Sequence, residues 1–207
     1  MRTKTLLIAA AALVAGIISS QAQTVYSANV VGYVNLPIPA NQFTLVANPL
    51  DNGTNTLNSL FASAPVGAVL EMWNGSGYSS ASKTPAGWNP NSTVAPGEGF
   101  FIKYASSATN TFVGSVVAPS GTSVTNSFQA GVFYLVSSPI PYADTLTGTN
   151  LNLQLGVGSV VEIWNGAGFT SSSRTPAGWS ANLTITPGEG FFVKSATATN
   201  WVETFNQ

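Results

Sequence analysis

The stretch Pro96-Gly97-Glu98-Gly99-Phe100-Phe101 recurs unchanged as residues 187–192. Eight residues before each copy's proline stands the tryptophan of a second repeated stretch, Thr84-Pro85-Ala86-Gly87-Trp88, which recurs as residues 175–179. Proline fixes one backbone angle and glycine permits conformations that other residues avoid, so these stretches are typical of turns. Two copies of the same turns 91 residues apart predict that the chain contains the same structural unit twice.

The match extends well beyond the two short stretches. Residues 69–103 and 160–194 align without a gap at an offset of 91, with 22 identities in 35 positions. Upstream, Phe43–Leu50 (FTLVANPL) matches Phe133–Ile140 (FYLVSSPI) at an offset of 90. This period exceeds the roughly 20–50 residues of solenoid repeats. It predicts two tandem homologous units with a pseudo-two-fold internal repeat, packed against each other.

The strand signals predict an all-β fold. Short runs rich in Val, Ile and aromatic residues are separated by Gly, Pro and Asn. Asn74-Gly75 and Asn165-Gly166 each stand between two such runs, where Asn-Gly is a strong hairpin signal. Residues 56–61, with Asn55 as a candidate N-cap, form the one helical candidate. We expect β-sandwich or barrel-like units.

The N-terminus has the pattern of an export signal. Arg2 and Lys4 precede an apolar run from Leu6 to Ile18, and small residues follow at Ser20 and Ala22. The run is shorter than the roughly 20 residues of a membrane span. We therefore expect a signal peptide at residues 1–22, β units at 23–118 and 119–207, and an exported protein (extracellular, periplasmic or cell-surface) without a membrane span in its mature form.

Composition argues against several classes of function. The chain has no Cys and no His. Histidine is the commonest metal ligand and the commonest general base in proteins. After residue 22 there are four basic and seven acidic residues, a net charge of −3. Four scattered cations cannot form the basic face that nucleic acid requires. So little charge also favours self-association, because little repulsion opposes it.

Eight of the eleven charges after residue 22 stand at positions 91 apart. The pairs are Glu71 and Glu162, Lys83 and Arg174, Glu98 and Glu189, and Lys103 and Lys194. A structural role is the main expectation: an ion pair, such as Glu98 with Lys83, or a carboxylate bonded to loop amides. A ligand-binding carboxylate and simple common ancestry are the alternatives.

Repeated aromatic residues are the second candidate feature. Trp73, Tyr78 and Trp88 match Trp164, Phe169 and Trp179. Exposed Trp and Tyr rings can stack on sugars, but Trp73 and Tyr78 can equally pair across their hairpin. Trp88 and Trp179 follow turns and are the ones we expect to be exposed. The candidate binding residues are Trp88, Trp179, Tyr78, Trp73 and Trp164.

We find no catalytic or metal-binding constellation in the sequence and expect no cofactor. Paired carboxylates of the glycosidase type have no supporting spacing, and no serine has a histidine partner.

The segments FTLVANPL, WNGSGY and PGEGFFIK together resemble a loosely defined group of exported bacterial all-β repeat proteins. Their repeats read F-x-L-V-x-N/S-P, W-N-G-x-G-Y/F and P-G-E/Q-G-F-F-V. The resemblance implies an accessory β-module on a surface or secreted protein, and it carries over no functional residues.

These observations predict a non-catalytic structural or adhesive protein of the cell surface or medium. Its partners would be further copies of itself or components of the envelope or matrix. The alternative is a carbohydrate-binding module whose exposed Trp and Tyr residues contact polysaccharide.

Overall fold

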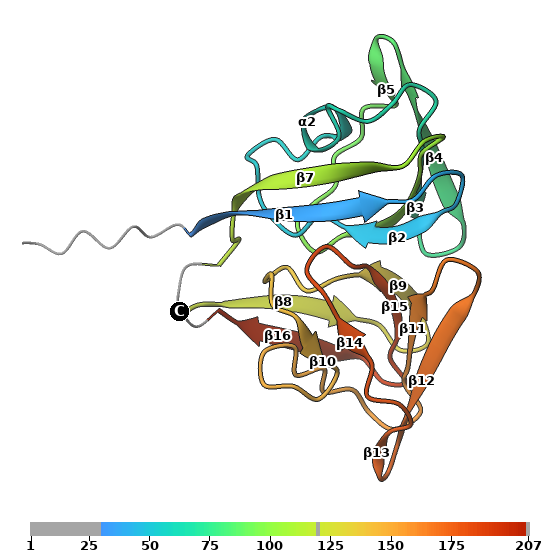
Figure 1. The fold of residues 1–207 in the computed structure, drawn as a ribbon. Helices are drawn as coiled ribbons and strands as arrows, with labels where there is room; N and C mark the ends of the chain where they lie inside the picture. Colours follow the sequence, from blue (N-terminus) through green and yellow to red (C-terminus); the bar gives the residue numbers. More distant parts are fainter. Residues whose placement is uncertain (1–29, 119–120, 206–207) are drawn as a thin grey trace, which may run out of the picture.

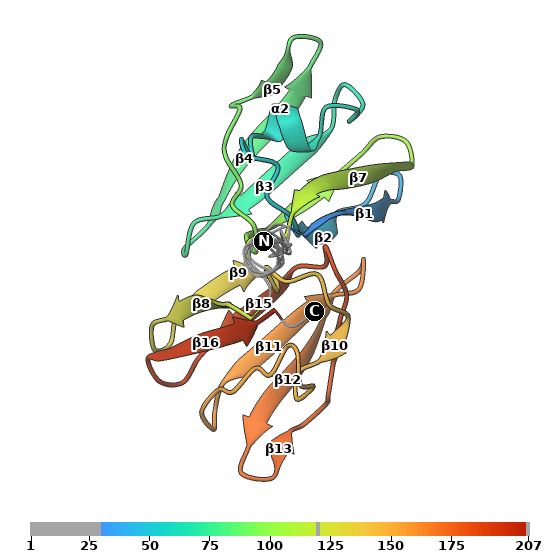
Figure 2. The same cartoon turned by 90° about the vertical axis from the view of Figure 1, so that its left-hand side faces the viewer.

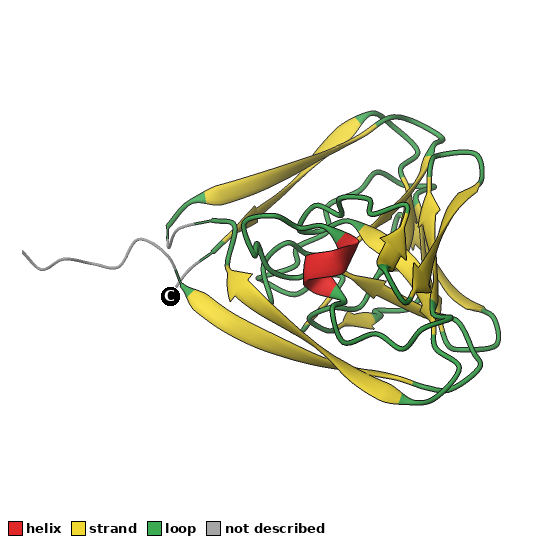
Figure 3. Ribbon diagram, turned by 90° about the horizontal axis from the view of Figure 1, so that it is seen from above, coloured by secondary structure: helices red, strands yellow, loops and turns green. Residues whose placement is uncertain are grey.

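A computed structural model describes residues 30–118 and 121–205 (Figure 1). The predicted signal peptide, residues 1–22, lies outside the described residues. The all-β prediction is confirmed, because strands dominate both halves of the chain and pair in antiparallel sheets (Figure 3). We refer to residues 30–118 as the first half and to residues 121–205 as the second half.

The first half contains a five-stranded sheet, a two-stranded sheet and one short helix. The sheet orders are β2-β6-β3-β4-β5 and β1-β7. The elements are β1 (Val31–Ile38), β2 (Thr44–Ala47), α2 (Leu57–Leu60), β3 (Val69–Trp73), β4 (Tyr78–Thr84), β5 (Gly87–Asn89), β6 (Gly99–Lys103) and β7 (Ala108–Ser115).

The second half has the same order in its large sheet, β9-β15-β11-β12-β13, and two small sheets, β8-β16 and β10-β14. Its strands are β8 (Ser123–Phe128), β9 (Phe133–Val136), β10 (Asp144–Thr145), β11 (Val160–Trp164), β12 (Phe169–Thr175), β13 (Gly178–Trp179), β14 (Thr184–Ile185), β15 (Phe191–Lys194) and β16 (Thr199–Thr204).

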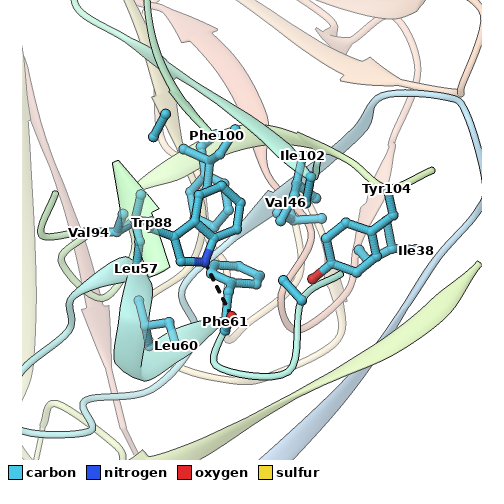
Figure 4. Packing of buried hydrophobic residues seen from close by; sticks show 14 of the residues in the cluster. Ile38, Val46, Leu57, Leu60, Phe61, Trp88, Val94, Phe100, Ile102 and Tyr104 are labelled. Atoms are coloured by element: carbon cyan, nitrogen blue, oxygen red, sulfur yellow. Dashed lines mark hydrogen bonds between the residues drawn. The ribbon is translucent and has the colours of Figure 1, made fainter. Parts of the chain in front are cut away.

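Each half has its own hydrophobic core. In the first half, Phe61 has ring contacts to Trp88 and Phe100 (Figure 4). It also has a ring contact to Phe112. These residues come from the large sheet, the β1-β7 pair and the segment that follows α2, so the core fills a sandwich-like space. In the second half, Phe191 and Trp201 belong to the corresponding cluster. Burial of such rings is the main stabilising contribution to each half.

Local turn chemistry sets the register of the hairpins. Trp73 pairs with Tyr78 across the β3-β4 hairpin. Asn74 closes the loop, since its side-chain oxygen accepts hydrogen bonds from the N–H groups of Ser76 and Gly77. The second half repeats the pairing with Trp164 opposite Phe169. Both predicted Asn-Gly hairpins are therefore confirmed.

The helical candidate is confirmed in a shorter form, because α2 has only four residues. Its N-cap is Thr56 rather than the predicted Asn55. Thr56 and Ser59 form a reciprocal capping box, and Asn55 instead has a left-handed backbone with φ of 51°. The side chain of Asn55 donates to Asp51, at 2.7 Å, so it stabilises the preceding loop.

The two halves lie one above the other and meet at one edge of each large sheet (Figures 1 and 2). A mixed cluster of buried residues joins them: Leu45 and Phe101 from the first half, and Leu135 and Phe192 from the second. β2 and β9 are the strands at the two edges that meet. The position of this junction creates the candidate site described next.

Candidate functional site

The PGEG turn of the second half covers the edge of β2. Val46 forms an antiparallel bridge with Glu189, and the Ala47 N–H donates to the Gly188 carbonyl oxygen at 2.9 Å. Exposed sheet edges invite uncontrolled pairing with other chains. The turn therefore protects this edge while holding the two halves together.

The reciprocal contact covers the edge of β9 with the PGEG turn of the first half. Glu98 forms an antiparallel bridge with Val136, and the Ser137 N–H donates to the Gly97 carbonyl oxygen at 2.8 Å. Each PGEG stretch thus serves the other half of the chain. The sequence predicts a turn at these residues but does not indicate this partner.

The second glycine of each turn is needed for the close approach of the halves. A Cβ atom on Gly190 would lie 2.7 Å from the Val46 carbonyl oxygen, and one on Gly99 would lie 2.9 Å from the Leu135 side chain. Contacts this short do not occur for real Cβ atoms. A larger residue at either position would have to push the halves apart.

Eight aromatic rings gather on the face of the two large sheets at this junction, and we call this surface the aromatic groove. Its members are Phe43, Trp73, Tyr78, Phe101, Phe133, Trp164, Phe169 and Phe192. The Trp73 indole N–H donates to the Phe133 carbonyl oxygen at 2.9 Å, and the Trp164 indole N–H donates to the Phe43 carbonyl oxygen at 2.8 Å. Both indoles are therefore fixed by backbone of the opposite half.

Edge-to-face contacts lock the rings of the groove together. Phe101 lies 5.6 Å from Trp164 between ring centroids, and Trp73 lies 5.6 Å from Phe192, both across the junction. Such contacts contribute about 0.5–1.5 kcal/mol each beyond burial. Tyr78 and Phe169 nevertheless remain 47% and 43% exposed, so they present ring surface to solvent.

The groove contains two hollows that share Tyr78 and Phe169. The first hollow, of about 440 Å³, is lined by Phe43, Glu71, Tyr78, Phe101, Trp164 and Phe169. The second hollow, of about 180 Å³, is lined by Trp73, Tyr78, Phe133, Glu162, Phe169 and Phe192. Each combines five rings with one carboxylate.

The two carboxylates are held by serines of the neighbouring strand. Ser80 Oγ donates to Glu71 Oε2 at 2.6 Å, and Ser171 Oγ donates to Glu162 Oε1 at 3.2 Å. Burial and the Glu71 charge both raise the pKa of Tyr78, with burial the larger cause. The Tyr78 hydroxyl therefore stays protonated and can donate a hydrogen bond near Glu71.

Of the predicted binding residues, Trp73, Tyr78 and Trp164 belong to the groove, whereas Trp88 and Trp179 do not. The predicted exposure of Trp88 is wrong, because only 4% of it is accessible. The turn folds it back onto the core, where its indole N–H donates to the Phe61 carbonyl oxygen at 3.2 Å (Figure 4). Trp179 is half-buried beneath Arg174, whose guanidinium carbon is 5.9 Å from the ring centroid.

The repeated charges outside the hollows make local contacts. Glu98 Oε2 accepts a hydrogen bond from the Ala95 N–H at 2.9 Å, as Glu189 Oε2 does from the Thr186 N–H at 3.0 Å. Lys83 donates to the carbonyl oxygens of Phe61 and Ala62. The proposed Glu98–Lys83 ion pair is therefore wrong, and the alternative of a carboxylate bonded to loop amides is what the structure has. Burial raises the pKa of Glu98, because it disfavours the charged form.

Five members of the groove were not among the predicted binding residues: Phe43, Phe101, Phe133, Phe169 and Phe192. Alternation along β6 was the available signal for one of them. Phe100 and Ile102 point into the core, so Phe101 must point to the other face of the sheet. The same argument applies to Phe192 between Phe191 and Val193.

Comparison with protein-family models, with curated proteins and with solved structures finds no match to this chain. Within residues 30–118 and 121–205, no helix has the length and apolar character needed to cross a membrane. The described residues also contain no group of three or more acidic side chains arranged to hold a metal ion.

Proposed function

We propose that this chain is a non-catalytic adhesive protein of the cell exterior that binds polysaccharide through the aromatic groove. The observation that carries the proposal is the solvent-facing ring surface of Tyr78 and Phe169 above hollows that each hold a carboxylate. Sugar rings have apolar faces that stack on aromatic rings and hydroxyl groups that bond to carboxylates. An open sheet face with rings held by backbone suits an extended chain of sugars.

The rigidity of the groove supports a binding role. Rings that are already locked in place lose little freedom when a ligand arrives. The hydrogen bonds from Trp73 and Trp164 to the opposite half fix both indoles before binding. Export is part of the proposal and rests on the signal-like pattern of residues 1–22.

The test is affinity electrophoresis through gels that contain cellulose derivatives, soluble chitin derivatives, xylan or mixed-linkage glucan. We expect at least one polysaccharide to retard the protein. Tyr78→Ala combined with Phe169→Ala should weaken that binding about tenfold or more, because two stacking surfaces are lost. Val202→Ala is the control for loss of exposed apolar surface, since Val202 is 48% exposed on β16 and lines neither hollow. Equal retardation of the double variant and the wild type would exclude the groove as the site.

A second candidate, self-association, is favoured by a separate apolar surface on the β1-β7 pair. Tyr33 and Val113 are register partners there, 71% and 59% exposed, and Val31 is 68% exposed. Sedimentation velocity at micromolar concentration tests this candidate. Dimers or larger species that disappear in Tyr33→Ser would support it, whereas a monomer at all concentrations would oppose it.

A further inference from the structure

Each hollow of the aromatic groove combines ring faces with a carboxylate, an arrangement that suits a cation. The face of an aromatic ring carries partial negative charge, which attracts cations within about 6 Å. Each hollow brings five such rings together with a carboxylate. A neutral sugar uses such a carboxylate only as a hydrogen-bond acceptor, whereas a protonated amino group is also attracted by its charge.

Among the described residues, the hydrogen-bond donors to the carboxylates of the hollows are serines, not lysines or arginines. Glu71 accepts its hydrogen bond from a serine on Oε2, which leaves Oε1 for a ligand, and Glu162 accepts one on Oε1, which leaves Oε2. Within the described part of the chain, no lysine or arginine lines either hollow. A half-buried carboxylate beside apolar rings attracts a cation more strongly than one in open water.

The protein already places two of its own ammonium groups on rings of this groove. Lys103 Nζ lies 4.9 Å from the centroid of Phe43, and Lys194 Nζ lies 4.8 Å from the centroid of Phe133. These contacts are at a distance typical of cation–π attraction. These lysines lie beside the hollows, on one ring of each, and show that rings of this surface attract ammonium groups; the other rings of each hollow stand with a carboxylate and, among the described residues, no lysine.

We infer that each hollow binds a protonated amino group, so that the polysaccharide is a glycan with free amino groups. This inference rests on the proposed function and specifies its ligand. The two hollows share Tyr78 and Phe169 and are therefore adjacent, which lets two amino sugars of one chain bind together. Simultaneous occupation of two linked sites strengthens binding without additional contacts.

The test compares two probes by titration calorimetry at about pH 5, where amino groups are protonated. One is the β-1,4-linked glucosamine hexamer, and the other is its fully N-acetylated form. We expect the wild type to bind the glucosamine hexamer at least tenfold more tightly. Glu71→Gln combined with Glu162→Gln should abolish this preference while retaining binding of the acetylated hexamer, because the rings remain.

A matched control separates the local effect from net charge. Val66→Lys combined with Val157→Lys also raises the net charge by two, at residues that are each 59% exposed and line neither hollow. This control should keep the preference. Equal affinity of the wild type for both hexamers, or a preference that survives in the double Gln variant, overturns the inference but leaves the proposed function intact. Failure of both hexamers and of every polysaccharide gel overturns the proposed function as well.

Discussion

Glu203 provides the sharpest prediction about stability, because it is a carboxyl group buried in β16 with only 2% of its surface accessible. Ser138 Oγ lies 2.6 Å from Glu203 Oε1 and 2.5 Å from the Ile140 carbonyl oxygen. A hydroxyl group has one hydrogen and cannot donate to two acceptors. Both contacts are hydrogen bonds if Glu203 carries the proton and donates to Ser138, which then donates to Ile140.

Burial also raises the pKa of Glu203 from 4.5 to about 8, against a smaller lowering by the Ser138 hydrogen bond. The native state therefore retains a proton that the unfolded chain releases above pH 4.5. Stability from this group is complete below pH 4.5 and is lost as the pH rises towards 8. Each pH unit of increase in this interval lowers the free energy of unfolding by about 1.4 kcal/mol, a loss of about 3–4 kcal/mol between pH 5 and pH 8.

Glu203→Gln tests this reasoning, because glutamine keeps the shape and can donate to Ser138 without ionising. The assay is urea unfolding of wild type and variant at pH 5, 6, 7 and 8. We expect the wild type to lose about 3–4 kcal/mol more than the variant over this range. Asp51 and Asp144, whose pKa values are lowered, act in the opposite direction but are present in both proteins, so their effect cancels. Parallel curves for the two proteins would refute a protonated Glu203.

Two substitutions test the junction and the core. Gly190→Ala should destabilise the protein by about 1–3 kcal/mol, because its Cβ would meet the Val46 carbonyl oxygen at 2.7 Å. Gly168→Ala is the control and should be far milder, because a Cβ there would have nothing within 4 Å. Equal melting temperatures of the two variants would contradict the close approach of the halves. Trp88→Ala should lower the free energy of unfolding by about 3–5 kcal/mol, because it leaves a cavity in the core. Trp179→Ala should lower it less, because Trp179 is only half-buried. The reverse order in chemical unfolding would contradict the burial of Trp88.

The hairpins could be predicted from the sequence because their determinants are local. Asn74 closes its own loop, and the pairing of Trp73 with Tyr78, with ring centroids 5.1 Å apart, involves residues five positions apart. The burial of Trp88 could not be predicted in this way. It depends on Phe61, which lies 27 residues earlier, and β5 is only three residues long, too short for a pattern to indicate its inner face.

The groove was predictable only in part, for the same reason. Trp73 and Trp164 are candidates because they recur at matching positions of the repeat, but their partners Phe133 and Phe43 lie 60 and 121 residues away. No periodicity within a strand contains that information. The two indoles nevertheless have matching surroundings, and this supports the proposal that the two halves are copies of one ancestral unit.

The most direct test of the groove as a binding surface uses the indole N–H signals of the five tryptophans, Trp73, Trp88, Trp164, Trp179 and Trp201, in a nuclear magnetic resonance titration. The ligand is an oligosaccharide of the polysaccharide that retards the protein in gels. We predict that the signals of Trp73 and Trp164 shift together and saturate, while those of Trp88 and Trp201, buried in the two cores, stay unchanged. Binding that shifts Trp179 and leaves Trp73 and Trp164 unchanged would contradict the account.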